Sequence, residues 1–486
     1  MSSTQEASGT ARPSRPVRPI PVLIAVLVLA DIVSAFESTM MFNALPRIIG
    51  AFHTTPADAS WVLTAFLLVA AASAAVCGRL GDLYGRRNVI IVLLLISAVG
   101  SVISVSTGTL TGVIAGRAVQ GVSGGILPLC FGVAREILPK KHAPVAAAMI
   151  AGAAMLAGAA GNIISGALID TLDWHYIFVV AAAVAVIAAA GCLLLPRSRV
   201  VAGARRVSWF GSVLFAPAIG LVLFGVNKSS SWGWSDGRTL GTIVTGLLLL
   251  ALWVWRELRV DHPMINLRLF SDRKVALTML ATAVLAIGPV GATGFLLQII
   301  MQTPTDAPVG LGLSATDAGW VSFCIAIFGF LLSPLSGRIS ARAGSRRALI
   351  IGSVFGVINA ATLAMLHSTL MGLIISTVFL TVATSFILSS LPNLIMEAAP
   401  VENTSEATGL NVVVRTTFSG VGTSVATLLL SMSLVSGTHF STRGAYMQVF
   451  VLIGISCAVA LILALLIRPG VRAASGAAPA VAASKA

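Results

Sequence analysis

The chain has 486 residues, of which 57% are hydrophobic and only 10% are charged. This balance excludes a water-soluble globular protein, because soluble domains carry about 25% charged residues, and it indicates a protein that crosses the membrane many times. The net charge of +14 gives no reason to expect a nucleic-acid partner, because most basic residues fall between apolar runs on one predicted side of the membrane.

Apolar runs predict fourteen membrane-spanning helices, each of which needs roughly 20 apolar residues. Residues 1–18 form a polar tail that we expect to be disordered and cytoplasmic, and not a signal peptide. An N-terminal six-helix bundle then occupies residues 19–196. Its spans are expected at about 21–46, 61–78, 88–105, 110–138, 145–169 and 174–195.

A linker over residues 197–272 carries two extra spans, at about 209–226 and 240–255. Near its end, residues 262–270 are expected to lie as a short amphipathic piece on the inner membrane surface. A C-terminal six-helix bundle follows over residues 273–468, and residues 469–486 form a second disordered cytoplasmic tail. Its spans are expected at about 274–301, 318–336, 348–366, 370–396, 408–435 and 446–467.

The basic residues set the orientation of these spans. With a cytoplasmic N-terminus, 25 of the 31 Lys and Arg fall in cytoplasmic segments, as the positive-inside rule requires. Both termini are therefore expected in the cytoplasm. Arg117 and Arg415 are left within predicted spans.

The chain is an internal duplication, because residues 58–87 recur in register at 317–346. Both copies begin Asp-Ala-x-Trp-Val, continue as an apolar run, and end in Gly-Arg and a tight Gly-x-Arg turn. The matching positions are Gly78 with Gly337, Arg79 with Arg338, Gly85 with Gly344 and Arg87 with Arg346. Two structurally related halves are expected.

Other motifs exclude several kinds of chemistry. The five cysteines stand singly in apolar spans without metal-ligand spacing, so we interpret them as small core residues and expect no metal site. The chain has no Gly-x-x-x-x-Gly-Lys-Ser/Thr motif for a nucleotide. We therefore expect neither an enzyme nor a bound cofactor, and any work must come from a gradient such as that of protons.

Two motifs carry a family resemblance. GRLGDLYGRR at 78–87 resembles the signature of the major facilitator superfamily between helices 2 and 3, and Arg117-x-x-Gln120-Gly121 resembles its helix 4 signature. The Glu37-Ser38-Thr39 and Ala44-Leu45-Pro46 motifs, the two extra spans and the HPMINLRLF stretch at 262–270 are similar to the fourteen-span drug:proton antiporters. The resemblance implies an all-α major facilitator fold and a secondary active transporter.

The chain departs from the family pattern at two places. The helix 1 acid, usually Asp, is Glu37. The helix 5 antiporter motif, usually Gly-Pro-x-x-Gly-Gly, is present without its proline and consists here of Gly161, Asn162, Ile163, Ile164, Ser165 and Gly166.

Two acids in the first span are candidates for proton coupling. An ionised carboxylate in the membrane costs several kcal/mol unless it is paired or hydrated, so such residues are functional candidates by default. Arg117 lies at a similar depth to Glu37 and can pair with it. A nearby cation favours the ionised carboxylate and dehydration favours the protonated one, so conformation can switch proton binding. Glu37 is the expected main site, with Asp31 and Arg117; alternatively, Asp31 only bonds a neighbouring helix.

Asp82 suggests a contact between the halves, because the second copy has Ala341 in its place. The resemblance implies that this acid holds a cytoplasmic gate against the start of the thirteenth span, near 406–408, where a helix N-terminus attracts an anion. The basic residues would also serve as ordinary inward anchors whatever the function. The gating candidates are Gly78, Asp82, Gly85, Arg86, Arg87, Arg135, Glu136 and Glu406.

A substrate cavity is expected between the halves. The thirteenth span carries a polar stripe at Thr408, Asn411, Arg415 and Ser419, and the first span carries a soft apolar face. Alternatively, Arg415 reaches the interface and the apolar residues are plain packing. The cavity candidates are Ser34, Met40, Met41, Gln120, Gln298, Asn411 and Arg415.

The sequence thus favours proton-coupled efflux of small amphipathic compounds or drugs by alternating access, by a monomer in the cytoplasmic (inner) membrane of a bacterium. The alternatives are an exporter of a specific metabolite or lipid, and a transporter-like sensor or scaffold. The intramembrane charges favour the first reading, because a scaffold has no need of them.

Overall fold

The computed structural model describes residues 19–41, 44–54, 59, 61–139, 141–197, 209–260, 272–313, 315–399, 404–433 and 440–467. Both predicted tails and the predicted amphipathic piece at 262–270 lie outside these residues. The secondary-structure elements of the described chain are all helices. The structure therefore has the all-α class that the apolar runs and the family resemblance predict.

The first half contains the helices up to the linker. They are α1 (Ile20–Thr39), α2 (Leu45–Phe52), α4 (Trp61–Tyr84), α5 (Arg86–Ser106), α6 (Leu110–Gln120), the 3₁₀ segment η1 (Gly121–Gly125), α7 (Ile126–Ile137), α8 (Ala143–Thr171) and α9 (His175–Cys192).

The linker and the second half follow. The linker helices are α10 (Trp209–Trp232) and α11 (Gly237–Glu257). The second half contains α12 (Arg273–Leu285), the π segment η3 (Ala286–Ala292), α13 (Thr293–Gln302), α14 (Ala315–Ala343), α15 (Ser345–Leu366), α16 (Leu370–Ala398), α17 (Thr404–Met432) and α18 (Arg443–Leu466).

Thirteen candidate spans in the described chain are long and apolar enough to cross a membrane. The predicted fourteenth corresponds to α10, whose qualifying apolar part is the shorter stretch Pro217–Val226. The first span was predicted to continue to Pro46, but α1 ends at Thr39 and Pro46 stands in the first turn of α2. Proline fits in a first turn, because a backbone N–H at that position would have no partner within the helix. It could not continue α1, because the helix interior needs that N–H.

The duplication is visible in the local geometry of the two halves. Gly85 and Gly344 precede α5 and α15 with φ of 92° and 91°, in the region that glycine adopts without a steric penalty. Thr109 and Thr369 cap α6 and α16 alike, each accepting a bond from the backbone N–H three residues on. The same sequence signals therefore give the same turns twice.

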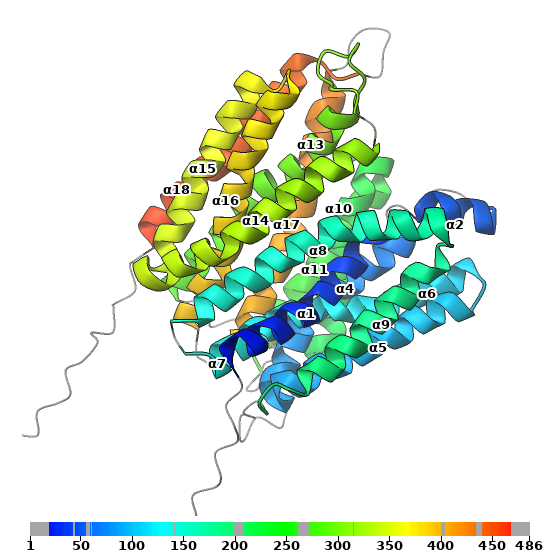
Figure 1. The fold of residues 1–486 in the computed structure, drawn as a ribbon, viewed down its shortest axis with the longest axis vertical. Coiled ribbons are helices and arrows are strands. Elements are labelled where there is room, and N and C mark those ends of the chain that lie inside the picture. Colours follow the sequence, from blue (N-terminus) through cyan, green and yellow to red (C-terminus); the bar gives the residue numbers. More distant parts are fainter. Residues whose placement is uncertain are drawn as a thin grey trace, which may run out of the picture.

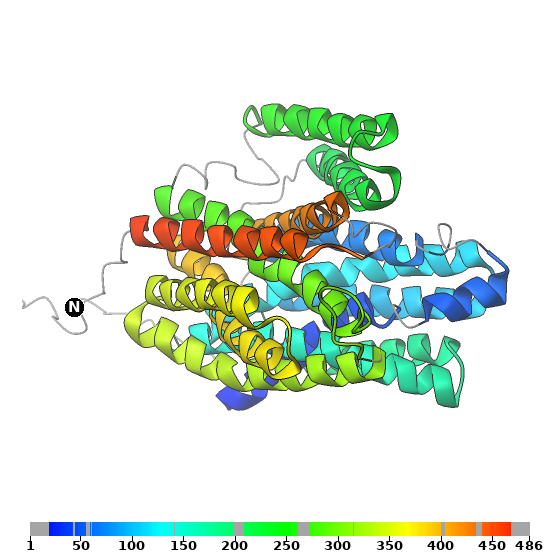
Figure 2. The ribbon, with the colours of Figure 1, turned by 90° about the horizontal axis from the view of Figure 1, so that it is seen from above.

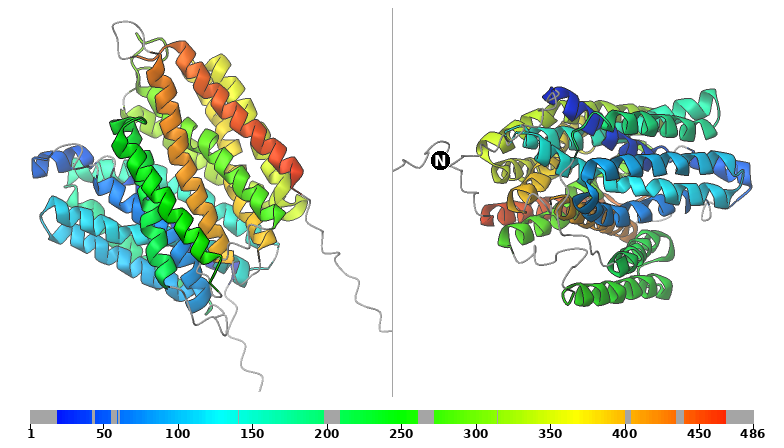
Figure 3. Two further views of the ribbon diagram at one scale, coloured as in Figure 1. Left: turned by 180° about the vertical axis from the view of Figure 1, so that it is seen from behind. Right: turned by 90° about the horizontal axis from the view of Figure 1, so that it is seen from below.

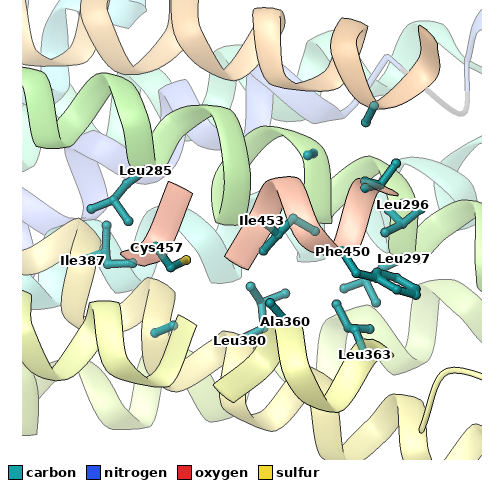
Figure 4. Packing of buried hydrophobic residues seen from close by; sticks show 14 of the residues in the cluster. Leu285, Leu296, Leu297, Ala360, Leu363, Leu380, Ile387, Phe450, Ile453 and Cys457 are labelled. Atoms are coloured by element: carbon teal, nitrogen blue, oxygen red, sulfur yellow. The ribbon is translucent and has the colours of Figure 1, made fainter. Parts of the chain in front are cut away.

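Each half has its own apolar core. In the second half, side chains of α12, α13, α15, α16 and α18 pack together around Phe450 and Ile453 (Figure 4). The first turns of α1 and α17 and the last turns of α4, α7 and α18 lie at one end of the molecule, here called the terminal face (Figure 1). The two halves meet toward this face and diverge toward the opposite face (Figure 1).

Two seams join the halves, α4 with α17 and α8 with α14. Each has a close backbone approach at a glycine of the duplicated motif. A Cβ on Gly78 would lie 2.5 Å from the carbonyl oxygen of Ser405, and one on Gly337 would lie 2.6 Å from Cα of Val145. The glycines are thus required because no side chain fits between the two helices.

The linker helices lie outside both halves (Figures 2 and 3). Helix α10 packs against α4 of the first half and α17 of the second. Phe224 stacks on Trp61 of α4 with ring centroids 5.2 Å apart, and Ser424 of α17 donates to the carbonyl oxygen of Val226. Helix α11 packs mainly on α10 and presents apolar residues such as Leu248 outward. The pair therefore covers the α4–α17 seam.

We predict that Gly78→Ala opens the terminal face, because the added methyl group overlaps the Ser405 carbonyl. Overpacking of this kind costs about 1–3 kcal/mol. The measurement is the distance between spin labels on Tyr84→Cys and Arg342→Cys in a Cys324→Ser background, and we expect longer distances. Gly319→Ala is the control, because a Cβ there meets open space. Unchanged distances in Gly78→Ala would contradict the prediction.

Candidate functional site

Glu37 lies in the last turn of α1 and is fully buried within the first half. Its Oε1 accepts a hydrogen bond from the hydroxyl of Ser97 on α5. Its Oε2 accepts one from Ser123 Oγ, in η1, at 2.7 Å. Each carboxylate oxygen thus has one hydroxyl donor, and this replaces part of the hydration that burial removes.

Arg117, on α6, is the cation of this site and is also fully buried. It acts electrostatically on Glu37, but its hydrogen bonds go elsewhere: Nε donates to Val62 O at 3.2 Å and Nη1 to Gln120 Oε1 at 3.0 Å. Its guanidinium carbon lies 4.2 Å from the centroid of the Phe66 ring. Protein contacts therefore fix the position of Arg117, and it influences the carboxylate from a distance.

Asp31 lies six residues before Glu37 and is also buried, with Oδ2 lacking a hydrogen-bond partner among the described residues. The charged group that acts on it is Arg415 of α17, in the other half. The sequence indicated that Asp31 need not share the Glu37 pocket, and the structure links it to Arg415. The two predicted acids thus have different cationic partners.

Several cavity candidates occupy other places. Met40 and Met41 are fully buried in a packed cluster with Trp174 and Phe178, and Gln120 is buried with its amide donating to Ser101 Oγ. In this conformation Met40 and Met41 pack in the core and Gln120 also accepts from Arg117, so their place in a substrate cavity stays a prediction. Their pattern along the helix gave no means of separating the two roles.

The polar stripe of α17 also divides. Asn411 is buried and donates to Thr282 Oγ1 of α12 at 2.6 Å, so it belongs to the packing of the second half. Thr408 Oγ1 reaches the carbonyl oxygen of Pro128 in the first half at 3.3 Å. Arg415 is half-buried, and Ser34 on α1 is likewise half-buried. A shared helix face therefore includes residues with separate partners.

Gln298 is exposed on α13 toward the opposite face. Its amide donates to Ser322 Oγ of α14 at 3.0 Å and accepts from Gln302 at 3.1 Å. It borders an open pocket of about 420 Å³ together with Ile299, Gln302, Thr303 and Pro304. Gln298 is thus a cavity candidate that lines a pocket in the described part of the chain.

The helix 5 motif lies on α8, which packs along α1. A Cβ on Gly161 would lie 2.5 Å from Thr39 Oγ1, so the motif glycine allows close contact next to Glu37. Ser165 is fully buried and Gly166 is half-buried. The side chain of Asn162 lies outside what the structure describes.

At the terminal face, Asp82 bonds both halves. Its Oδ1 accepts from Arg86 Nε at 2.8 Å, and its Oδ2 accepts from the backbone N–H of Glu406 at 3.1 Å. The acceptor faces the first turn of α17, where unpaired N–H groups and the helix dipole favour an anion. This is the place at which the sequence expected the contact.

Arg86 and Arg79 extend the same network. Arg86 donates to Ser405 Oγ of α17 at 2.9 Å and to Glu136 Oε2 of α7 at 3.0 Å. Arg79 pairs with Glu406 at 3.1 Å across the seam. This network thus brings the gating candidates Asp82, Arg86, Glu136 and Glu406 together at the start of α17.

Arg135 makes a second crossing from α7. Its Nη1 donates to Ala399 O at 2.9 Å and to Thr404 Oγ1 at 2.7 Å in the other half. Arg87 differs, because it donates to the carbonyl oxygens of Cys192 and Leu193, which end α9 of its own half. Arg346 does the same at the end of α18, so these duplicated arginines satisfy helix C-termini.

Sequence reasoning missed four hydroxyl partners in this geometry: Ser97, Ser123, Thr404 and Ser405. Serines and threonines are frequent in apolar helices, where they bond to their own backbone. The one available signal was the Gly-Val-Ser-Gly-Gly run directly after the Arg117 motif, because three glycines within a span favour a break at which Ser123 departs from helical geometry.

A family model decides the relationship: the Major Facilitator Superfamily model matches residues 27–263 and 277–485. The chain belongs to the Major Facilitator Superfamily. It is therefore a multi-pass membrane transporter rather than an enzyme. Solved structures share the fold: the human organic anion transporter MFSD10 (TETRAN) superposes with a TM-score of 0.63 at 13% identity, covering 93% of this chain and 100% of that one.

Two relatives of this facilitator come from bacteria. The tetracenomycin C resistance and export protein of Streptomyces glaucescens is 28% identical over 339 residues, a match that covers 69% of this chain and 61% of the relative. The lincomycin resistance protein LmrB of Listeria monocytogenes is 26% identical over 440 residues, covering 88% of this chain and 89% of the relative. The chain thus spans about three fifths of one relative and most of the other.

We predict that Asp82→Asn weakens the closed terminal face by about 1–2 kcal/mol, the range for a charge at a partly buried helix end. A loss of 1.4 kcal/mol lowers the closed population about tenfold relative to the open one. The distance between spin labels on Tyr84→Cys and Arg342→Cys, in a Cys324→Ser background, measures the opening. Ala341→Asp, which adds an acid to the same frame in the other half, is the control. Equal distances with and without the Asp82 charge would show that the acid does not hold the halves together.

Proposed function

We propose that this transporter exports small amphipathic compounds from the cytoplasm in exchange for protons, across the cytoplasmic (inner) membrane of a bacterium. The observation that carries the proposal is Glu37: a buried carboxylate in a membrane span, with one hydroxyl on each oxygen and a fixed arginine nearby. Such a group is costly and is retained where a proton is bound and released. The names of the bacterial relatives support drugs as the substrate class.

Export requires two conformations that expose a central site alternately. We place the terminal face in the cytoplasm, so the structure corresponds to the state that is closed on the cytoplasmic side. The Asp82, Arg86 and Arg135 contacts then stabilise this state, and they must break when substrate enters. A ligand shifts such an equilibrium only by its differential affinity for the two states.

Exchange follows if the proton and the substrate favour opposite arrangements of the site. Glu37 gains a proton while the site faces the outside and loses it to the cytoplasm. The arginine at 117 favours the ionised form and burial favours the protonated one, so a small change in solvent access moves the proton. A scaffold or sensor would not need this cycle, and an exporter of one metabolite or lipid would share it with a narrower substrate range.

We expect Glu37→Gln to abolish proton-driven export while leaving membrane insertion and substrate binding largely intact, because the amide keeps the shape and cannot titrate. Export is measured as substrate accumulation in vesicles with an imposed pH gradient, with substrates found by a resistance and accumulation screen in a host that lacks its own pumps. Glu397→Gln is the matched control, because Glu397 is an exposed acid paired with Lys274. Full proton-driven transport by Glu37→Gln would sink the proposal.

Arg117→Ala is expected to lower export at least tenfold and to change the pH dependence of the remaining activity, because the cation that favours the ionised carboxylate is lost. Arg117→Lys should retain more activity than Arg117→Ala, because lysine keeps the positive charge. It loses only the forked geometry with which the guanidinium bonds Val62 and Gln120. The pH profile of export in vesicles is the measurement. A profile identical to that of the parent protein in Arg117→Ala would refute the electrostatic link to Glu37.

A further inference from the structure

The two hydroxyls on Glu37 come from segments of different stiffness. Ser97 belongs to α5, a regular helix of 21 residues. Ser123 belongs to η1, a 3₁₀ segment of five residues with the sequence Gly-Val-Ser-Gly-Gly that interrupts the fourth span between α6 and α7. A 3₁₀ stretch within a helix has poorer hydrogen-bond geometry and often marks a hinge. The bond from Ser123 is therefore the one that is free to change.

The three glycines hold η1 directly against α4. A Cβ on Gly121 would lie 2.7 Å from Phe66 O, one on Gly124 2.5 Å from Ala70 O, and one on Gly125 3.0 Å from Ser73 O. Close backbone contact of this kind guides how the segment can move. If η1 rewinds, α4 therefore prevents a sideways shift of the segment. The displacement is passed along the chain to the next helix.

The chain leads from η1 straight into the gate. Helix α7 begins at the next residue and carries Arg135 and Glu136 in its last turn. Arg135 donates to Ala399 and Thr404 of the second half, and Glu136 accepts from Arg86. One short helix thus joins the segment that holds Glu37 to the residues that close the terminal face.

We propose that Ser123 is a positioning residue that couples the proton site to the terminal face: protonation of Glu37 releases Ser123, η1 rewinds, and α7 withdraws its contacts from the second half. This inference rests on the proposed function, in which Glu37 carries the proton.

The chemistry of the carboxyl group gives the direction of the change. Ionised Glu37 has two acceptor oxygens and takes both hydroxyl donors. A proton arriving from the opposite face converts one oxygen into a donor, so one serine hydroxyl must turn or leave. Ser97 is held by α5, and Ser123 leaves. The proton later passes to the cytoplasm when the terminal face has opened, and the O–H bond of the carboxyl group is the one covalent bond that forms and breaks.

The size of the movement is sufficient. An α-helix rises 1.5 Å per residue with 3.6 residues per turn, and a 3₁₀-helix about 2.0 Å with 3.0. Each residue that rewinds therefore shortens the segment by about 0.5 Å and turns α7 by about 20°. Two residues move α7 by about 1 Å and about 40°. The Arg135 bonds of 2.7 and 2.9 Å do not survive such a shift, because hydrogen bonds are lost beyond about 3.5 Å.

The charged and titratable groups around Glu37 are few. Arg117 of α6 acts on it, and Asp31 lies on α1 itself. Helix α7 contributes Cys130, on which Asp31 acts, and Arg415 of α17 acts on Asp31. Among the described side chains, Glu37 is thus the acid that contacts η1, and its protonation is the event that Ser123 reports.

The test compares the distance between spin labels on Tyr84→Cys and Arg342→Cys, in a Cys324→Ser background, at pH 8 and pH 5 in nanodiscs. In the parent protein we expect acidification to lengthen the distances. Ser123→Ala should show the long distances already at pH 8. Its pH-driven change in the ratio of open to closed molecules should be at least tenfold smaller than that of the parent protein. Ser123→Thr keeps the hydroxyl and should restore the response. Ser104→Ala, a buried serine on α5 that bonds Gly100 O, should respond as the parent does.

The outcomes separate this inference from the proposed function. If Ser123→Ala folds and responds to pH as the parent does, the inference is wrong. If Ser123→Ala is unstable, Ser123→Cys, which keeps a weak donor, decides: a full response from it at reduced stability also overturns the inference, and a weakened response supports it. If Glu37→Gln retains both proton-driven export and the pH response, the proposed function fails instead.

Discussion

The buried carboxylate of Glu37 is the constraint on which the rest of the first half depends. An ionised group without water is tolerated only where its hydrogen bonds and a counter-charge are supplied by the protein. Here α5 and η1 each supply a hydroxyl, and α6 supplies an arginine that Val62 and Gln120 hold through Nε and Nη1. Placing Ser123 in reach requires the fourth span to break, and the break requires glycines against α4. Four helices are thus arranged around one side chain.

The closed terminal face uses two seams with the same shape and different chemistry. At both, a glycine of the duplicated motif lets a helix approach the start of a helix in the other half. Only the α4–α17 seam adds the Asp82, Arg86 and Glu406 network. Shape therefore brings the halves together at both places, and charge distinguishes one seam from the other. Buried charge pairs contribute more to a defined arrangement than to net stability, which suits a contact that must also open.

The sequence predicted much of this because some signals are strong. Hydropathy and basic residues gave the spans, and the comparison of Asp82 with Ala341 pointed to the start of α17. Other features follow from three-dimensional packing that no local pattern carries. Met40 and Met41 look the same in a cavity wall as in a core, and Asn411 looks the same whether it faces a substrate or Thr282. Ser97 and Ser123 matter because they meet at Glu37 from distant segments, and a serine in an apolar run carries no sign of its partner.

The helices α10 and α11 bring the lipid bilayer into contact with the moving parts. Helix α10 touches Trp61 on one side of the α4–α17 seam and Ser424 on the other, so it must tilt or slide when that seam rearranges. Helix α11 follows it and presents leucines outward. A tilting apolar helix changes its match to the hydrocarbon thickness, at a cost of fractions of a kcal/mol per ångström. The balance between the two conformations consequently depends on acyl-chain length, and membranes of different thickness will set different resting states for the same protein.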